Sequence, residues 1–223
     1  MLKKTTTAIA MLATLVLTSV ATSAAIIDLF DDGVPGGNWK RTIDTIQVKE
    51  QGRLKTRSMQ PGGGERFSGY KADRWKVVYT ENFAISMNYN VEPPSVTGSR
   101  RAGIGFRFVP SGDIDEVRIL VEQTRTQLRV WYQVTDGEQQ ITRKAVINAT
   151  RGQLKVRYRA NADRLDILID GEVVKQIDDF LDDVNVGTGE MRVEVGAFRT
   201  GRVMWDWNDL WLDRVIINGA VVD

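Results

Sequence analysis

Apolar and polar residues alternate along the chain from Phe83 to Phe198, and short polar turns interrupt the alternation. In the segment 83–91 every second residue is large and apolar, and most residues between them are small or polar. The same pattern returns in the segments 117–121, 128–134, 154–158, 165–169 and 191–195. A period of two residues is typical of β-strands with one buried face, whereas an amphipathic helix repeats every three to four residues. The pattern therefore predicts an all-β protein built from antiparallel strands.

Turn signals separate the apolar segments. The dipeptides Asp136-Gly137 and Asp170-Gly171 lie between apolar runs and are typical of two-residue β-hairpins. The segment 93–99 contains two prolines, which lack the N–H that a strand ladder needs, so we expect a long loop there. The acidic segment 177–185 is where we expect a brief helical turn. About a dozen short strands in a chain of this length predict a single two-sheet antiparallel sandwich, which we place at residues 26–223.

The first 25 residues show a different pattern. Lys3 and Lys4 precede an apolar run at 8–20, and small residues follow at 22–25. This order is typical of a cleavable secretory signal, and the apolar run is short for a membrane span. We therefore expect residues 1–25 to be removed after Ala24 or Ala25 and the domain to be secreted or periplasmic. An uncleaved N-terminal anchor is the alternative interpretation.

Composition excludes several classes of function. Removing Lys3 and Lys4 from the 30 basic residues leaves 28 against 29 acidic ones, a net charge of −1, which argues against a nucleic-acid-binding surface. The chain has no cysteine, so disulfides and thiolate metal sites are excluded. It also has no histidine, the usual general base of hydrolytic triads, which argues against a serine hydrolase.

Several segments, in this order along the chain, resemble the concanavalin A-like and laminin-G-like jelly-roll domains of bacterial secreted proteins: 29–32 with Trp39, 103–108, 165–174, and 195–198 with 212–217. The resemblance covers nearly the whole chain after the leader. It implies an all-β, two-sheet antiparallel jelly-roll sandwich of the lectin and glucanase type. It also implies a polysaccharide or other glycan as the partner.

The resemblance further implies a structural calcium ion, which in this family often ties the first strand to the last. Asp213 matches the family's position in the last strand, and Asp31 or Asp32 lies at the other end. Calcium requires several oxygen ligands, which carboxylates supply. The alternative is that Asp31-Asp32-Gly33 forms an ordinary turn and that Asp213 is a surface charge beside Arg214.

The same family includes laminarinase-type glycoside hydrolases, whose catalytic carboxylates share one face of a strand. The segment Asp113-Ile114-Asp115-Glu116 resembles their motif superficially. However, Asp113 and Asp115 share the parity of Val117, which we expect in the core, while Glu116 faces the other way with Arg118. A retaining glycosidase needs two carboxyl groups about 5 Å apart. We therefore interpret the segment as a turn and predict no catalytic residue.

An aromatic residue among polar ones gives the candidate ligand-binding surface. Trp131 has the outward parity of its strand and lies between Arg129 and Gln133. The residues expected to join it on a concave sheet are Arg107, Arg118, Arg157 and Asn88. An indole can stack on a sugar ring, and guanidinium groups form paired hydrogen bonds with carboxylates and sulfates, so this row predicts an acidic polysaccharide as ligand. The alternative is an ordinary solvated strand face, with Trp131 covered by the loop at 93–101.

Three classes of function remain open from the sequence. The first is an exported, non-catalytic glycan-binding module, and the second is a glycoside hydrolase or lyase on the same fold. The third is a structural or adhesive envelope protein, which a large exposed apolar patch would favour.

Overall fold

The computed structural model describes residues 26–30, 39–42, 46–59, 64–73, 76–93, 96–110, 116–136, 139–184, 189–219 and 221–222. These residues form two antiparallel sheets and one short 3-10 helix, η1 (Ala160–Ala162), so the all-β prediction is confirmed. No helix of the described ranges is long and apolar enough to cross a membrane.

Sheet A has eight strands. Their spatial order is β14 (Glu172–Asp178), β13 (Arg164–Ile169), β12 (Arg151–Arg159), β7 (Phe83–Val91), β16 (Trp205–Gly219), β4 (Leu54–Ser58) and β3 (Gln47–Glu50). The eighth strand, β1 (Ile26–Asp28), pairs with the C-terminal part of β16. The first described strand therefore lies beside one of the last.

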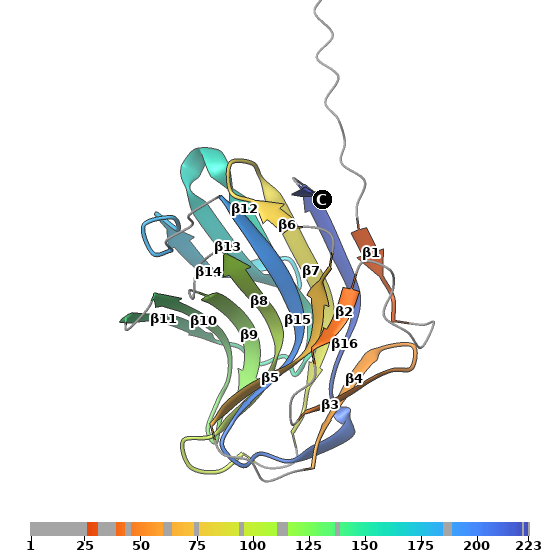
Figure 1. The fold of residues 1–223 in the computed structure, drawn as a ribbon. Coiled ribbons are helices and arrows are strands. Elements are labelled where there is room, and N and C mark those ends of the chain that lie inside the picture. The colour runs from red at the N-terminus through yellow and green to blue at the C-terminus, as the bar shows by residue number, and fades with distance from the viewer. Residues whose placement is uncertain are drawn as a thin grey trace, which may run out of the picture.

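Sheet B has nine strands. Their order is β11 (Gln139–Val146), β10 (Leu128–Asp136), β9 (Glu116–Gln123), β8 (Arg101–Pro110), β15 (Glu190–Thr200), β5 (Glu65–Ala72) and β2 (Trp39–Thr42). In addition, β6 (Lys76–Val78) pairs with β15, and β17 (Val221–Val222) pairs with β6. The chain passes between the sheets after β1, β2, β4, β6, β7, β11, β14, β15 and β16, so strands distant in sequence become neighbours (Figure 1).

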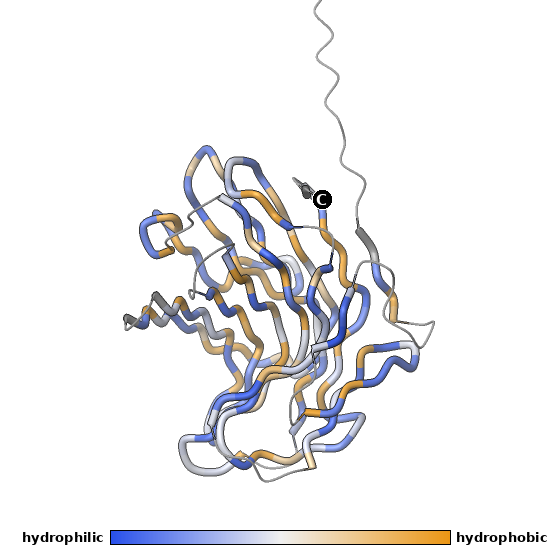
Figure 2. The backbone as a smooth tube through the Cα atoms, viewed as in Figure 1, coloured by the Kyte–Doolittle hydropathy of each residue, from blue (hydrophilic) through white to orange (hydrophobic). Residues whose placement is uncertain are grey.

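The core lies between the two sheets and is formed by the alternating apolar positions. Hydrophobic and hydrophilic residues alternate along the strands in Figure 2. On β7, for example, Phe83, Ile85 and Met87 are buried and the residues between them are partly exposed. The opposite sheet supplies residues such as Phe106 of β8 and Tyr132 of β10, both fully buried. Burial of one apolar face per sheet is the main source of stability, since apolar area removed from water is the dominant favourable term in folding.

The turns agree with the sequence predictions in most places. Asp170 and Gly171 both have positive φ angles, 51° and 89°, as a type I′ turn between β13 and β14 requires. The chain also forms a hairpin between β10 and β11. The helical turn predicted at 177–185 is found over a shorter stretch. β14 extends to Asp178, and the backbone N–H groups of Asp182, Asp183 and Val184 then each donate to the carbonyl three residues earlier. Phe180 is fully buried, and its backbone N–H donates to the carbonyl of Asp163, so this segment is held against the core.

Candidate functional site

The outer face of sheet B, the face turned away from sheet A, collects most of the predicted ligand-binding residues. Arg107 of β8 lies opposite Arg118 of β9, which in turn lies opposite Gln133 of β10. Trp131 and Arg129 follow on the same face of β10, because side chains two residues apart on a strand share a face. The structure therefore brings these five residues together, from three neighbouring strands.

Two predicted residues lie elsewhere. Arg157 is on β12 and Asn88 is on β7, and both strands belong to sheet A, so the prediction that they join the row on one sheet is wrong. Arg157 donates from Nη2 to Oδ2 of the buried Asp166 at 2.7 Å. It also lines a separate cavity of about 450 Å³ near the end of β16. Parity along a strand indicates inward or outward, but it does not indicate which sheet the strand joins.

Buried carboxylates neutralise one half of the row. Arg107 forms ion pairs with Glu116 and with Glu194, whose Oε2 lies 3.1 Å from Nη1. Arg118 pairs with the same Glu116 and, at 2.5 Å, with Glu65 of β5. Glu116 and Glu194 have the outward parity of this face in the sequence, whereas Glu65 was not singled out there. Because Glu65 and Glu194 come from β5 and β15, their proximity depends on the order of the strands in the sheet.

These carboxylates are arranged for charge pairing. Glu116 and Glu194 lie on either side of Arg107 and both bind its guanidinium group. A glycosidase needs its two carboxyl groups facing a sugar, one of them able to hold a proton. Here both carboxylates contact the guanidinium that lies between them, so their oxygens face a cation of the protein. Asp113 and Asp115, interpreted as turn residues, lie outside the described residues.

Trp131 is half-buried among cations. The guanidinium carbon of Arg101 lies 4.2 Å from the centre of its ring, and that of Arg129 lies 4.5 Å away. The indole Nε1 donates to Oε1 of Gln133 at 3.0 Å. Arg101 ends the loop at 93–101, the region named above as a possible cover for Trp131. Arg101 was not singled out in the sequence, although its outward parity on the strand 101–110 could have indicated it.

A row of glycines crosses the middle of this face. Gly69, Gly196 and Gly105 are aligned on β5, β15 and β8. A Cβ atom at Gly196 would lie 2.2 Å from the carbonyl oxygen of Ser68, and one at Gly105 would lie 2.1 Å from that of Ile119. Neighbouring backbones therefore approach closely on this face, as expected on the concave side of a curved sheet, and the strands of sheet B are visibly curved in Figure 1.

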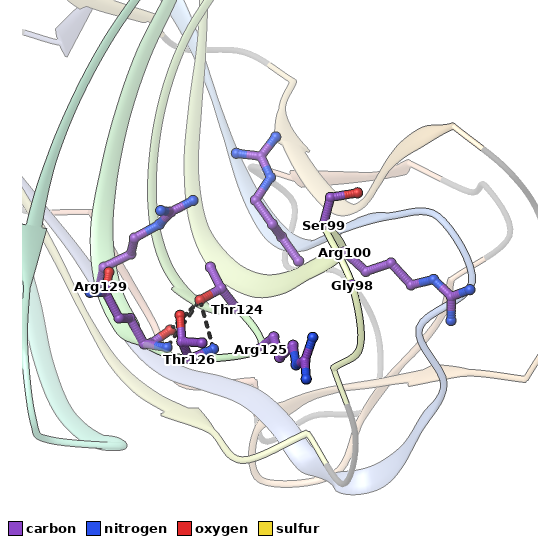
Figure 3. A pocket seen from close by; sticks show the side chains of 9 residues that line it. Gly98, Ser99, Arg100, Thr124, Arg125, Thr126 and Arg129 are labelled. Atoms are coloured by element: carbon purple, nitrogen blue, oxygen red, sulfur yellow. Dashed lines mark hydrogen bonds between the residues drawn. The ribbon is translucent and has the colours of Figure 1, made fainter.

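A cavity of about 290 Å³ lies at one end of the same face. Its lining comes from two segments, the end of the loop before β8 and the turn between β9 and β10 (Figure 3): Gly98, Ser99, Arg100, Arg101, Thr124, Arg125, Thr126, Gln127 and Arg129. Arg101 and Arg129, the two cations over the Trp131 ring, are thus also walls of the cavity. The outward parity of Arg129 is confirmed, whereas the contact between the segments 98–101 and 124–129 could not be predicted from the sequence.

Glu122 lies buried beneath two of these arginines. Its Oε1 accepts a hydrogen bond from Nε of Arg129 at 2.7 Å, and its Oε2 is 3.5 Å from Nη1 of Arg101. Burial raises the pKa of the Glu122 carboxyl, although the charges of Arg101 and Arg129 act in the opposite direction. The folded protein therefore favours the neutral form of this carboxyl more than the unfolded chain does.

This pKa shift gives a test by pH. Below the unfolded carboxyl pKa of about 4.3, Glu122 is neutral in both states and costs no stability. As the pH rises from there through the raised pKa of the folded state, ionisation of Glu122 lowers the free energy of unfolding. We expect Glu122→Gln, which cannot ionise, to gain stability relative to wild type between pH 4 and pH 7, measured by urea unfolding. Glu92→Gln is the opposite control, because Thr150 and Arg151 lower the pKa of the Glu92 carboxyl. A constant difference between wild type and Glu122→Gln across this range would contradict the assignment.

Asp213 is the one residue of the predicted calcium site that lies among the described residues. Asp213 faces Asn88 across the pair β16–β7, and the charges of Arg53 and Arg214 lie near its carboxylate, whose pKa burial raises. Within the described ranges, no group of three or more carboxylates is placed to hold a metal ion. Asp31 and Asp32 lie outside the described residues, so their part in the calcium prediction stays a prediction.

No protein-family model matches the chain, and no curated protein matches its sequence. Solved structures do resemble it. An endo-1,3-β-glucanase from Streptomyces sioyaensis superposes with a TM-score of 0.57 at 9% identity, covering 87% of this chain and 95% of the other. The carbohydrate recognition domain of Emp47p gives 0.53 at 14% identity, with coverage of 89% and 94%. The potassium-bound form of the Emp46p carbohydrate recognition domain gives 0.51 at 12% identity, with coverage of 82% and 88%.

These neighbours include both enzymes and lectin domains, and at such low identity they establish the fold alone. Their architecture is the one seen here, two antiparallel sheets packed face to face. The chain is a concanavalin A-like jelly-roll sandwich.

Proposed function

We propose that this protein is an exported, non-catalytic domain that binds an acidic polysaccharide on the outer face of sheet B. The observation that carries the proposal is Trp131, half-buried on that face, with Arg101 and Arg129 both over its ring and both lining the adjacent cavity. An aromatic ring next to fixed hydrogen-bond donors is a suitable surface for a sugar, whose faces are apolar and whose edges are polar. The lectin and glucanase folds of the neighbours support a carbohydrate ligand in general.

Three further observations bear on the details. The leader-like residues 1–25 support export to the periplasm or the medium. The ion pairs of Arg107 with Glu116 and Glu194 favour binding over glycoside hydrolysis, because both carboxylates are occupied by a guanidinium rather than facing a sugar. The excess of arginine around the cavity supports an acidic rather than a neutral polymer.

An adhesive role has less support. Five large apolar side chains are exposed among the described residues: Leu29, Met59, Val146, Val173 and Met204. Val146 and Val173 lie on different sheets, in β11 and β14, while Met59 and Met204 flank the paired residues Ser58 and Trp205 and make at most a small patch. Single exposed apolar residues are normal on a soluble domain, and only a contiguous patch indicates a protein-binding surface.

Affinity electrophoresis tests the proposal. We expect gels containing alginate or pectin to retard the wild-type domain, and laminarin gels to retard it little. Trp131→Ala should lose most of the retardation, because the sugar would contact the indole, and the same ring holds the guanidinium groups of Arg101 and Arg129 in place. The retardation of wild type should also weaken as salt is added.

Trp211→Ala is the matched control. Trp211 lies on β16 in sheet A, is also half-buried, and has the guanidinium of Arg53 at 3.9 Å from its ring centre. It therefore reproduces a tryptophan–arginine stack on the other sheet, and its loss should leave retardation unchanged. Equal retardation of wild type and Trp131→Ala in every gel, or retardation by laminarin alone, would overturn the proposal.

A further inference from the structure

We propose that the arginine-lined cavity at the end of sheet B binds the oxyanion substituent, a carboxylate or a sulfate, of one acidic sugar residue, with Arg125 and Arg129 as its ligands. This inference rests on the proposed function and assigns the recognition of charge within it. Within the row predicted from the sequence, Arg107 and Arg118 are each paired with two carboxylates and are therefore poorly placed to bind an anion. Among the described residues, Arg129 pairs with one carboxylate only, through Nε, and Arg125 of the cavity makes no ion pair.

The cavity has an excess of positive charge. Four arginines line it, and the carboxylates that contact them among the described residues are Glu122 and Glu65. Four guanidinium groups against two carboxylates leave an excess of two positive charges. Arg125 has no hydrogen bond or ion pair from its side chain within the part of the chain that the structure describes. An anion in the cavity would therefore gain attraction without displacing an existing partner of Arg125.

Arg129 is anchored through Nε, which leaves its two terminal amino groups available to a ligand. Its Nε donates to Glu122, which is fully buried, while its two terminal amino groups make no hydrogen bond to any described residue. A guanidinium anchored through Nε keeps those amino groups available, and their planar arrangement matches two oxygens of a carboxylate or sulfate. Arg100 is tied differently, since its Nη1 donates to Oγ1 of Thr97 and to the carbonyl of Arg202.

The turn that carries Arg125 has its own support. Oγ1 of Thr124 accepts from the backbone N–H of Gln127 at 3.0 Å and donates to the Gln127 carbonyl at 3.0 Å, as the dashed lines in Figure 3 show. A second N–H, that of Thr126, points to the same oxygen at 3.4 Å. These bonds fix the backbone on which Arg125 lies, so less ordering is required when a ligand binds.

The size and remaining lining favour a single sugar unit. A volume of about 290 Å³ is at the small end of the range of about 300 to 1,000 Å³ that ligand cavities occupy. The hydroxyl groups of Ser99 and Thr126 and the carboxamide of Gln127 also line the cavity and can contact sugar hydroxyls. The rest of a polymer would then continue toward Trp131, because Arg101 and Arg129 connect the cavity wall to that ring.

The test is calorimetric titration at constant ionic strength with four probes: glucuronate, galactose 6-sulfate, inorganic sulfate and glucose. We expect wild type to bind at least one of the two acidic sugars, and to bind it more tightly than inorganic sulfate or glucose. Arg125→Gln should weaken that binding tenfold or more, which is the loss expected for a charge-assisted contact. Arg143→Gln, at an exposed arginine of β11 outside the cavity, should bind within twofold of wild type. Circular dichroism and the melting temperature of both variants should match wild type, since both positions are exposed.

Several outcomes would overturn the inference: no binding of either acidic sugar, equal binding of glucose, equal binding of inorganic sulfate, or unchanged binding by Arg125→Gln. The gels described above separate this failure from failure of the proposed function. If Trp131→Ala loses retardation in alginate or pectin while Arg125→Gln keeps it, the cavity does not bind the acidic group, but the proposed glycan-binding function is retained. If no polymer retards wild type, the proposed function itself fails.

Discussion

Gly196→Ala is expected to destabilise the domain by about 3 kcal/mol or more, because an added methyl group would have to displace backbone rather than side chains. Its Cβ would lie 2.2 Å from the carbonyl oxygen of Ser68 and 2.7 Å from Cα of Gly69, both on the neighbouring strand β5. These distances are far inside van der Waals contact, so β5 and β15 would have to separate in the middle of sheet B. Guanidinium unfolding monitored by tryptophan fluorescence measures the loss.

Gly152→Ala is the control for this substitution. Gly152 also lies in a strand, β12, but its Cβ would meet the carboxylate of Asp170 at 2.7 Å. Asp170 is exposed, and the end of a side chain can move at small cost, so we expect a loss of less than about 1 kcal/mol. A similar stability for Gly196→Ala and wild type would show that the close approach of β5 and β15 on the outer face is incorrect.

Arg107→Met is expected to cost about 2 kcal/mol of folding free energy, since it leaves two buried carboxylates with one cation fewer: among the described residues, Glu116 keeps only Arg118, and Glu194 keeps only Arg192. The guanidinium of Arg107 contacts Glu116 and Glu194, and both carboxylates are buried. Methionine fills similar space without charge, so the loss would report electrostatics rather than packing. Urea unfolding at pH 7 is the measurement.

Arg192→Met is the matched control on the same face. Arg192 also contacts Glu194, at 3.3 Å, but among the described residues it contacts this one carboxylate only, and its side chain is somewhat more exposed, 41% against 32% for Arg107. We therefore expect a smaller loss, nearer the 0 to about 1 kcal/mol of an exposed ion pair. The double variant Arg107→Met with Glu194→Gln should recover part of the loss, because one of the two carboxylates that lost a partner is then uncharged. A loss below about 1 kcal/mol for Arg107→Met would mean that Arg107 does not stabilise Glu116 and Glu194. These two carboxylates would then be available as a catalytic pair.

The sequence and the structure agree most closely where the information is local. Alternation identified the strands that became β7, β9, β10, β12, β13 and β15, and it identified their inward and outward faces. Trp131 was placed outward, with Arg129 and Gln133 beside it, because a strand turns successive side chains to opposite faces. The Asp170-Gly171 hairpin was predictable for a similar reason, since two successive positive φ angles favour these residue types.

Tertiary structure decided how these faces combine. Arg157 and Asn88 have outward parity like Arg129, yet they lie on sheet A, because the membership of a strand depends on contacts between distant segments. Charge compensation depends on the same contacts: Arg107 meets Glu194 across 87 residues of sequence, and Arg118 meets Glu65 across 53. The cavity likewise exists because the loop ending at Arg101 and the turn at Arg125 come together. The sequence by itself therefore determined the strands and their outward side chains, which follow from local geometry. Only the folded sheet decided which arginines are neutralised and which remain available to a ligand, because that depends on distances between strands far apart in the chain.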